Sequence, residues 1–157
     1  MAGILNDHGM DLLLREAHTA PAWADQPVEP QTLRALYDLV RWGPTSANCS
    51  PSRYVFITSD AGKARLKPCL ADINVDKVMA APVTVLIGYD MEFYELLPKL
   101  FPLAPDAKSW FTGSQQLIHD TAFRNGTLQG GYFILAARAL GLDCAPMSGF
   151  DNGAADT

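Results

Sequence analysis

The sequence predicts one domain of mixed helices and strands, of the α+β or α/β class. The chain has 157 residues, which is the length of a single domain. Apolar residues make up 48% and charged residues 18%, a composition typical of a chain that folds around a core. Helical periodicity alternates along the chain with short apolar or β-branched runs, so both kinds of element are expected.

Before residue 45 the sequence predicts two helices. A short one covers residues 10–17, and an irregular loop follows at residues 19–23. The second helix begins at Pro30, because proline suits the first helical position. It ends before Gly43-Pro44, where glycine supplies a left-handed cap and proline cannot continue the helix. Its apolar residues recur at the spacing of one buried face: Leu33, Leu36, Tyr37 and Val40.

Two strands with a helix between them are predicted next. Residues 53–58 combine aromatic and β-branched side chains in a short run, as strands do. Ser59-Asp60 is expected to cap a short helix that runs to Lys67 and ends at Pro68. Residues 83–89 are almost continuously apolar, which predicts a central strand covered on both faces.

Residues 90–101 are predicted to be helical, residues 102–107 to form a loop and residues 114–142 to form the longest helix. Residues 143–147 are expected to add a strand, and residues 148–157 show no periodicity. Three glycines interrupt the long helix, each at a cost of about 1 kcal/mol relative to alanine. They either pack against another helix or let the backbone approach a flat ligand, and packing is favoured. These glycines are Gly126, Gly130 and Gly131.

Charge and cysteine usage restrict the class of function. Twelve Lys and Arg against seventeen Asp and Glu give a net charge of −5, which disfavours nucleic acid as the main partner. No apolar run approaches the roughly 20 residues of a membrane span, and residues 1–7 lack the basic start of a signal peptide. Cys49, Cys69 and Cys144 lack metal-binding spacing, so we expect reduced thiols in a cytoplasmic protein without a metal site.

Chemistry could lie in three polar loops. Residues 43–52 carry hydroxyls, an amide and a thiol, although this composition alone favours a turn that satisfies its own backbone. Cys49 could act there as a nucleophile with His119 or His18 as base. Lys77 alone is interpreted as a solvated charge, and residues 146–150 as a turn whose N–H groups could meet a ligand. The GxGxxG, Walker, HExxH and GxSxG motifs are absent.

Two motifs in register are specific, whereas either alone would be weak. Residues 43–51 are GPTSANCSP, and residues 146–151 are PMSGFD. Between them lie Asn74-Val75-Asp76-Lys77 and Thr121-Ala122-Phe123-Arg124-Asn125. Together these segments resemble the FMN-dependent nitroreductase family, and within it most of all the malonic semialdehyde reductases of pyrimidine degradation. The likeness covers nearly the whole chain from about Leu12.

The resemblance implies an α+β fold in three layers, with a mostly antiparallel central sheet flanked by helices in an intertwined homodimer. FMN would lie at the dimer interface. Asn74 and Lys77 match positions that hydrogen-bond the pyrimidine edge of the flavin, where a cation stabilises the reduced form. Two further sets match flavin contacts: Pro146, Met147, Ser148 and Gly149 beside the ring, and Thr45, Ser46 and Asn48 from the partner chain.

The reaction that the resemblance implies is hydride transfer in two steps. NADH or NADPH, which the sequence does not distinguish, reduces FMN and leaves. Malonic semialdehyde then takes the hydride and becomes 3-hydroxypropionate, with Arg124, or else Lys108, holding its carboxylate. A general nitro or quinone reductase of the same family is the first alternative. A thiol enzyme that uses Cys49 is the remotest one.

Two departures from the family pattern concern the flavin phosphate. Where the family usually has an arginine before the tryptophan of the N-terminal loop, this sequence has His18, and a histidine is mostly neutral at pH 7. Arg15, His18 and Thr19 are therefore the predicted contacts on this side. The family also continues past Phe150, so we expect one domain over residues 1–157 that is truncated at its C-terminus. A non-catalytic dimer that holds FMN poorly is a further alternative.

Overall fold

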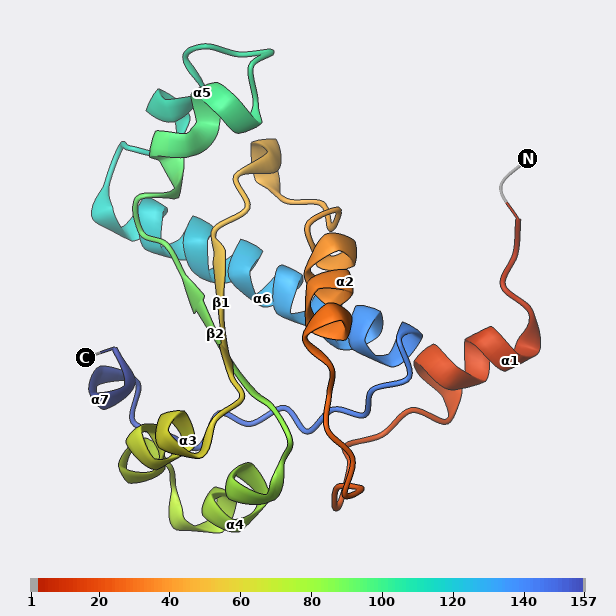
Figure 1. The fold of residues 1–157 in the computed structure, drawn as a ribbon. Coiled ribbons are helices and arrows are strands. Elements are labelled where there is room, and N and C mark those ends of the chain that lie inside the picture. Colours follow the sequence, from red (N-terminus) through yellow and green to blue (C-terminus); the bar gives the residue numbers. More distant parts are fainter. Residues whose placement is uncertain (1–2, 157) are drawn as a thin grey trace. The chain divides into compact units, whose positions relative to one another are not determined.

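The computed structural model describes residues 3–156 and has an α+β architecture (Figure 1). Met1, Ala2 and Thr157, the outermost residues of the predicted domain, lie outside the described residues. The described chain forms two compact units, each built from segments that are distant in the sequence. Unit 1 contains the residues up to Leu33, Phe56–Val85 and the residues from Ala137 onward. Unit 2 contains Arg34–Val55 and Leu86–Ala136.

The described chain contains several α-helices and two strands, which pair in one sheet. None of the helices in residues 3–156 is long and apolar enough to span a bilayer. The helices are α1 (Asp7–Met10), α2 (Pro30–Val40), α3 (Asp60–Leu66), α4 (Asp72–Ala80), α5 (Leu97–Leu100), α6 (Gln115–Ala139) and α7 (Asn152–Ala155), and the strands are β1 (Ser52–Ile57) and β2 (Thr84–Tyr89). Single turns of other helix types cover Asp11–Arg15, Ser46–Asn48, Lys67–Cys69, Phe93–Leu96 and Ala107–Trp110.

The helix boundaries follow local signals. Helix α2 begins at Pro30 as predicted and ends at Val40, shortly before the predicted stop at Gly43-Pro44. Helix α3 begins after Ser59, whose hydroxyl accepts the Gly62 N–H at 3.2 Å, so the predicted cap is confirmed. The helix predicted at residues 10–17 begins earlier, at Asp7, because the Asn6 side chain caps it. Its continuation over Asp11–Arg15 is a π-helical turn.

Strands β1 and β2 lie side by side and run antiparallel (Figure 1). The Asp90 N–H, just after β2, donates to the Pro51 carbonyl, just before β1, at 2.8 Å. The prediction that β2 is covered on both faces is wrong for its second half, because Ile87 and Tyr89 are exposed. The described sheet has β1 and β2 only, so the three-layer arrangement implied by the resemblance stays a prediction.

Residues 143–147 form no strand in the described structure, so this prediction is wrong. The Ala20 N–H donates to the Cys144 carbonyl at 3.0 Å, and a single bridge joins Leu70 to Phe150. A strand needs a ladder of bonds to a neighbour, and no strand of the described chain pairs with this segment. The local sequence of residues 143–147 was therefore not sufficient to predict their structure.

Helix α6 is the longest helix, as predicted, and its glycines differ in their surroundings. A Cβ added at Gly126 would lie 3.2 Å from the Cβ of Tyr89, so this glycine lets the helix approach β2 closely. Close packing was the favoured interpretation, although the neighbour is a strand and not a helix. A Cβ at Gly131 would have no neighbour within 4 Å. The helix is followed by Gly141, whose φ of +76° suits a glycine.

Candidate functional site

One face of α4 connects two segments of unit 1. Asn74 and Lys77 are three residues apart and therefore lie on the same face of the helix. The Asn74 Nδ2 donates to the Gly149 carbonyl at 3.0 Å, and the Lys77 Nζ donates to the Ala20 carbonyl at 3.1 Å. Helix α4 thus joins the predicted ring-side turn at Gly149 to the loop that begins next to Thr19. The interpretation of Lys77 as a solvated charge is wrong, because its side chain is half-buried and bonded to this loop.

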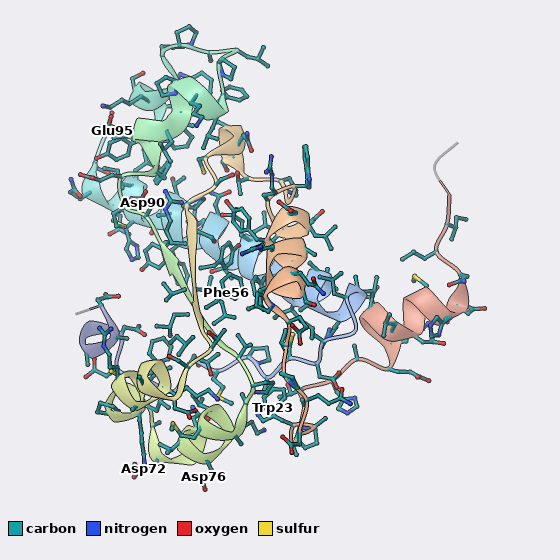
Figure 2. All side chains as sticks on the ribbon, viewed as in Figure 1. Trp23, Phe56, Asp72, Asp76, Asp90 and Glu95 are labelled. Carbon is teal, nitrogen blue, oxygen red and sulfur yellow. The ribbon has the colours of Figure 1, made fainter. Side chains whose placement is uncertain are left out.

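Two further features hold α4 in its place within unit 1. Lys63 is buried, and its ammonium donates to the carbonyls of Met79 (at 3.2 Å) and Ala81 at the C-terminal end of the helix. The acidic residues Asp72 and Asp76 are exposed and extend outward from α4 (Figure 2). Asp72 lies opposite Asn74 and Lys77 on the helical wheel, whereas Asp76 lies about 100° from Lys77 and lines the same cavity as Lys77.

The turn at Gly149 is closely packed against α4. A Cβ added at Gly149 would lie 2.7 Å from the Asn74 Nδ2, so the Asn74 amide would have to move for any larger residue. The Ala71 N–H donates to the Gly149 carbonyl at 3.0 Å and adds a backbone bond to the side-chain bond. Of the other residues predicted in this turn, Pro146 and Ser148 are exposed and Met147 is half-buried. The structure therefore brings this turn next to Asn74.

Trp23 is a part of this arrangement that sequence reasoning did not assign. Its Nε1 donates to the backbone carbonyl of Lys77 at 2.9 Å, while the Lys77 ammonium donates to Ala20. Lys77 is thus bonded through both its backbone and its side chain to one short stretch of the N-terminal loop. A tryptophan in a polar loop was the only available signal, because its indole N–H requires a partner when it is partly buried.

The predicted phosphate-side residues are engaged elsewhere in unit 1. The Arg15 guanidinium forms ion pairs at 2.8 Å with Asp7 and at 2.8 Å with Asp11. The Nδ1 of His18 lies 2.9 Å from the Glu16 carbonyl, and Thr19 is exposed. Arg15 would have to exchange an aspartate for a phosphate in order to bind it.

The loop at residues 45–50 in unit 2 has an unusual backbone. Three residues of this loop have left-handed φ angles although none of them is a glycine: Ala47 at 48°, Asn48 at 52° and Ser50 at 39°. Such strain concentrates at functional sites, where the surrounding structure maintains it. The Ser50 N–H donates to Thr45 Oγ1 at 3.0 Å, and the Asn48 Nδ2 donates to the Leu100 carbonyl at 2.8 Å. The predicted residues Thr45, Ser46 and Asn48 therefore belong to one constrained loop.

Cys49 lies in the core of unit 2. Its side chain has no exposed surface and packs in a cluster that also contains Phe93, Leu97 and Ile118. Burial raises the pKa of the Cys49 thiol, and a hydrogen bond with Thr45 opposes that rise only in part. A buried thiol with a raised pKa is a poor nucleophile at neutral pH. The geometry therefore argues against the thiol enzyme.

The two candidate carboxylate-binding residues in unit 2 differ in their availability. The Lys108 ammonium lies 2.6 Å from the Glu95 carboxylate and over the ring of Tyr94. The Arg124 side chain is 78% exposed and has only a long contact of 3.8 Å with Asp120. Arg124 is thus the residue better able to accept a ligand carboxylate.

The surroundings of α4 fit the pyrimidine end of FMN. The Lys77 ammonium has three donors and gives one to Ala20, which leaves donors for a ligand carbonyl. The Gly149 turn lies against Asn74 at a distance that only glycine permits, so the backbone of this turn lies next to the Asn74 amide. A cavity of about 890 Å³ in unit 1 adjoins this arrangement, because Lys77 and Trp23 line it, whereas Asn74 and the Gly149 turn do not. Among residues 3–156, no three His, Cys, Asp or Glu side chains gather as a metal-binding group.

A family profile and a relative with high sequence identity both relate this chain to the same protein family. The profile of the Nitroreductase family matches residues 14–156. A protein from Burkholderia lata is 58% identical over 152 residues, which cover 97% of this chain and 77% of that relative. It carries the provisional name NADH dehydrogenase/NAD(P)H nitroreductase.

Two solved structures share the fold at low sequence identity. A provisionally named nitroreductase from Exiguobacterium sibiricum, in complex with FMN, has a TM-score of 0.85 and 19% identity, and the match covers 98% of this chain and 80% of that chain. A provisionally named nitroreductase from Bacillus subtilis has a TM-score of 0.83 and 23% identity, covering 96% and 80% of the two chains. The predicted nitroreductase-like α+β fold is thereby confirmed. Because the family profile and the Burkholderia relative both cover nearly all of its sequence, this chain belongs to the nitroreductase family.

Proposed function

We propose that the protein is an FMN-dependent oxidoreductase that takes electrons from NADH or NADPH. The observation that carries the proposal is the connection made by α4: Asn74 is bonded to the Gly149 turn, and Lys77 is bonded to the loop next to Thr19. Two of the segments that the family resemblance assigns to the flavin, α4 and the Gly149 turn, thus adjoin each other in unit 1. The name of the Burkholderia relative and the FMN bound by the Exiguobacterium structure support the same activity.

In this proposal, Asn74 and Lys77 hold the pyrimidine edge of FMN, and the turn Pro146–Gly149 faces its ring. Bound FMN supplies the acceptor and donor of hydride, which no side chain can supply. The Lys77 ammonium favours the added negative charge of the reduced flavin, because it is fixed by Ala20 and does not have to reorganise. On the phosphate side, Arg15, His18 and Thr19 are the proposed contacts.

A second copy of the chain would complete the site with its Thr45, Ser46 and Asn48. Large apolar side chains are exposed on α6 and just after α2, including Trp42, Phe123, Leu128 and Tyr132. A monomer rarely leaves so many such side chains in water, so a partner surface is a natural explanation for them. We propose a homodimer for this reason.

For the substrate we propose malonic semialdehyde, which the enzyme would reduce to 3-hydroxypropionate. The exposed guanidinium of Arg124 can hold the carboxylate of such an aldehyde, whereas Lys108 is already paired with Glu95. The second candidate is a general nitro or quinone reductase, which the name of the Burkholderia relative favours. Fold alone does not decide between these substrates.

The substrate proposal is tested with Arg124→Ala. We expect the KM for malonic semialdehyde to rise by about tenfold or more, since a charge-assisted bond contributes roughly 1.5–3 kcal/mol. The KM for an uncharged nitroaromatic compound should change little. Lys108→Ala is the matched control and should affect neither KM strongly. Equal effects of Arg124→Ala on both compounds would remove Arg124 from carboxylate binding and favour the general reductase.

The flavin proposal is tested by the visible spectrum of the purified chain after FMN addition and dialysis. We expect retained flavin absorbance that bleaches when NADH or NADPH is added without oxygen. Absence of retained flavin would favour the non-catalytic dimer. Cys49→Ser distinguishes the thiol enzyme from the flavin enzyme and the non-catalytic dimer, because this substitution should abolish activity only if the thiol is the nucleophile.

A further inference from the structure

Helix α6 has three buried polar side chains on one face, at intervals of four residues. Thr121 is 8% exposed, Asn125 is 7% exposed and Gln129 is 4% exposed. Buried polar groups are unfavourable unless they are hydrogen-bonded, so each must have a partner. The Thr121 hydroxyl donates to the Leu117 carbonyl of its own helix at 2.7 Å. The two amides, in contrast, reach beyond the helix.

The two amides accept backbone N–H groups from Ser46, in the loop before β1, and from Ser52, the first residue of β1. The Asn125 Oδ1 accepts the Ser46 N–H at 2.9 Å, and the Gln129 Oε1 accepts the Ser52 N–H at 2.9 Å. The Asn125 Nδ2 donates back to the Thr121 carbonyl at 2.9 Å, which fixes the orientation of that amide on α6. The two side chains, here called the amide pair, therefore bind residues 46–52 at both ends.

The segment between these two bonds is the strained one. Ala47, Asn48 and Ser50 all have left-handed φ angles, and alanine and serine adopt that region at a cost. A short loop does not hold such a backbone by itself, because relaxed conformations of the same residues are lower in energy. Bonds from a long helix to both ends of the loop exclude those conformations. The fully buried side chain of Cys49 lies between them and reports on whether the loop is closed.

We infer that Asn125 and Gln129 are positioning residues that hold residues 46–52 in their strained form. Through this loop they set the backbone at Ser46 and the side chain of Asn48, which the proposed function assigns to the flavin of a second copy. The effect on flavin rests on the proposed function, whereas the effect on the loop does not. Neither amide is required to touch the flavin.

A series of variants with side chains of similar size tests this inference. Asn125→Leu and Gln129→Met remove the two loop bonds without leaving a large hole. Thr121→Val is the matched control, because it removes a buried polar group from the same face of α6 but no bond to the loop. The first measurement is the rate at which a thiol reagent modifies Cys49 in the native protein, resolved by peptide mass spectrometry. Cys69 and Cys144, which are half-buried in unit 1, serve as internal references.

We expect both amide variants to speed modification of Cys49 by about tenfold or more relative to Cys69, and the valine variant to change it less than twofold. If Asn125→Leu does not fold, Gln129→Met carries the same comparison. Equal protection of Cys49 in all three variants, or equal exposure in all three, would overturn the positioning role.

The second measurement is the dissociation constant for FMN in the same proteins. Both amide variants should weaken FMN binding by about fivefold or more, and Thr121→Val should leave it within twofold. If the wild-type chain binds no FMN, the proposed function fails, and the Cys49 comparison still decides the positioning role. If the amide variants expose Cys49 but bind FMN as the wild type does, the link between this loop and the flavin is overturned.

Discussion

At the scale of single residues, Lys77 is held in position by hydrogen bonds to two residues of the N-terminal loop. Its ammonium donates to Ala20, and its backbone carbonyl accepts the Trp23 indole N–H. The sequence shows a lysine three residues after an asparagine, but neither of these partners lies near it along the chain. The sequence analysis predicted no helix over residues 72–80, so both the shared helix face of Asn74 and Lys77 and their bonds to distant residues required the folded structure.

Replacing Lys77 with methionine tests the electrostatic role of this residue. We expect FMN to bind about tenfold more weakly and the reduction potential of the bound flavin to fall, because a fixed cation favours the reduced, more negative form. Titration with FMN and a redox-dye equilibrium measure the two effects. Lys67→Met is the matched control, since Lys67 is exposed in the same unit and should change neither quantity. An unchanged potential in the Lys77 variant would contradict the assignment.

Because the thiol of Cys49 is buried, we expect the protein to lose stability at alkaline pH. Burial raises the pKa of its thiol, so the unfolded chain releases this proton at a lower pH than the folded chain does. The protonated Cys49 thiol makes its full contribution to the free energy of unfolding at a pH below the pKa of the unfolded thiol. That contribution is lost as the pH rises above the unfolded pKa and toward the higher pKa of the folded thiol. The free energy of unfolding should therefore fall above about pH 8.5. Denaturant titrations from pH 7 to 10 should give a shallower fall for Cys49→Ala, and identical slopes would contradict the prediction.

At the scale of elements, local signals predicted boundaries better than pairings. Helix α2 begins at Pro30 as expected and ends at Val40, just before the expected stop at Gly43-Pro44, because the signals at both of its ends are local. Residues 143–147 were wrongly expected to be a strand, because strand formation depends on a neighbour that the local sequence does not describe. The amide pair was also missed. Polar residues at four-residue spacing in an apolar helix face were the available signal for it.

Two glycines of α6 should respond in opposite ways to alanine. Gly131→Ala should stabilise the protein by about 1 kcal/mol, since the added Cβ meets no atom within 4 Å and alanine favours the helix. Gly126→Ala should destabilise it, because its Cβ would lie 3.2 Å from the Tyr89 Cβ on β2. Thermal unfolding of both variants measures the difference. A loss of stability in Gly131→Ala would place another surface against this position, which a second copy of the chain would explain.

At the scale of the whole molecule, the family and the α+β fold could be predicted from two motifs in register. The substrate could not, because hydride transfer from a flavin imposes few demands on side-chain chemistry. Within the described residues, the proposed flavin contacts divide between unit 1, which holds Asn74 and Lys77, and unit 2, which holds Thr45, Ser46 and Asn48. The resemblance implied that these two sets meet across a dimer interface, and we therefore predict that cofactor binding requires assembly.

This requirement gives a prediction in which assembly and FMN binding change together. Leu128→Lys places a charge on the exposed side of α6, at a residue that is 46% exposed in the single chain. If α6 packs against a second copy, burial of that charge is unfavourable and the dimer dissociates. Light scattering should then give a mass near the 17.0 kDa of one chain in place of twice that value, and FMN affinity should fall with it. Leu103→Lys is the matched control, because Leu103 is 87% exposed in a loop and should tolerate the charge. A monomeric Leu128 variant that binds FMN as tightly as the wild type would show that one chain holds the flavin alone, and the contacts assigned to Thr45, Ser46 and Asn48 of a second copy would be wrong.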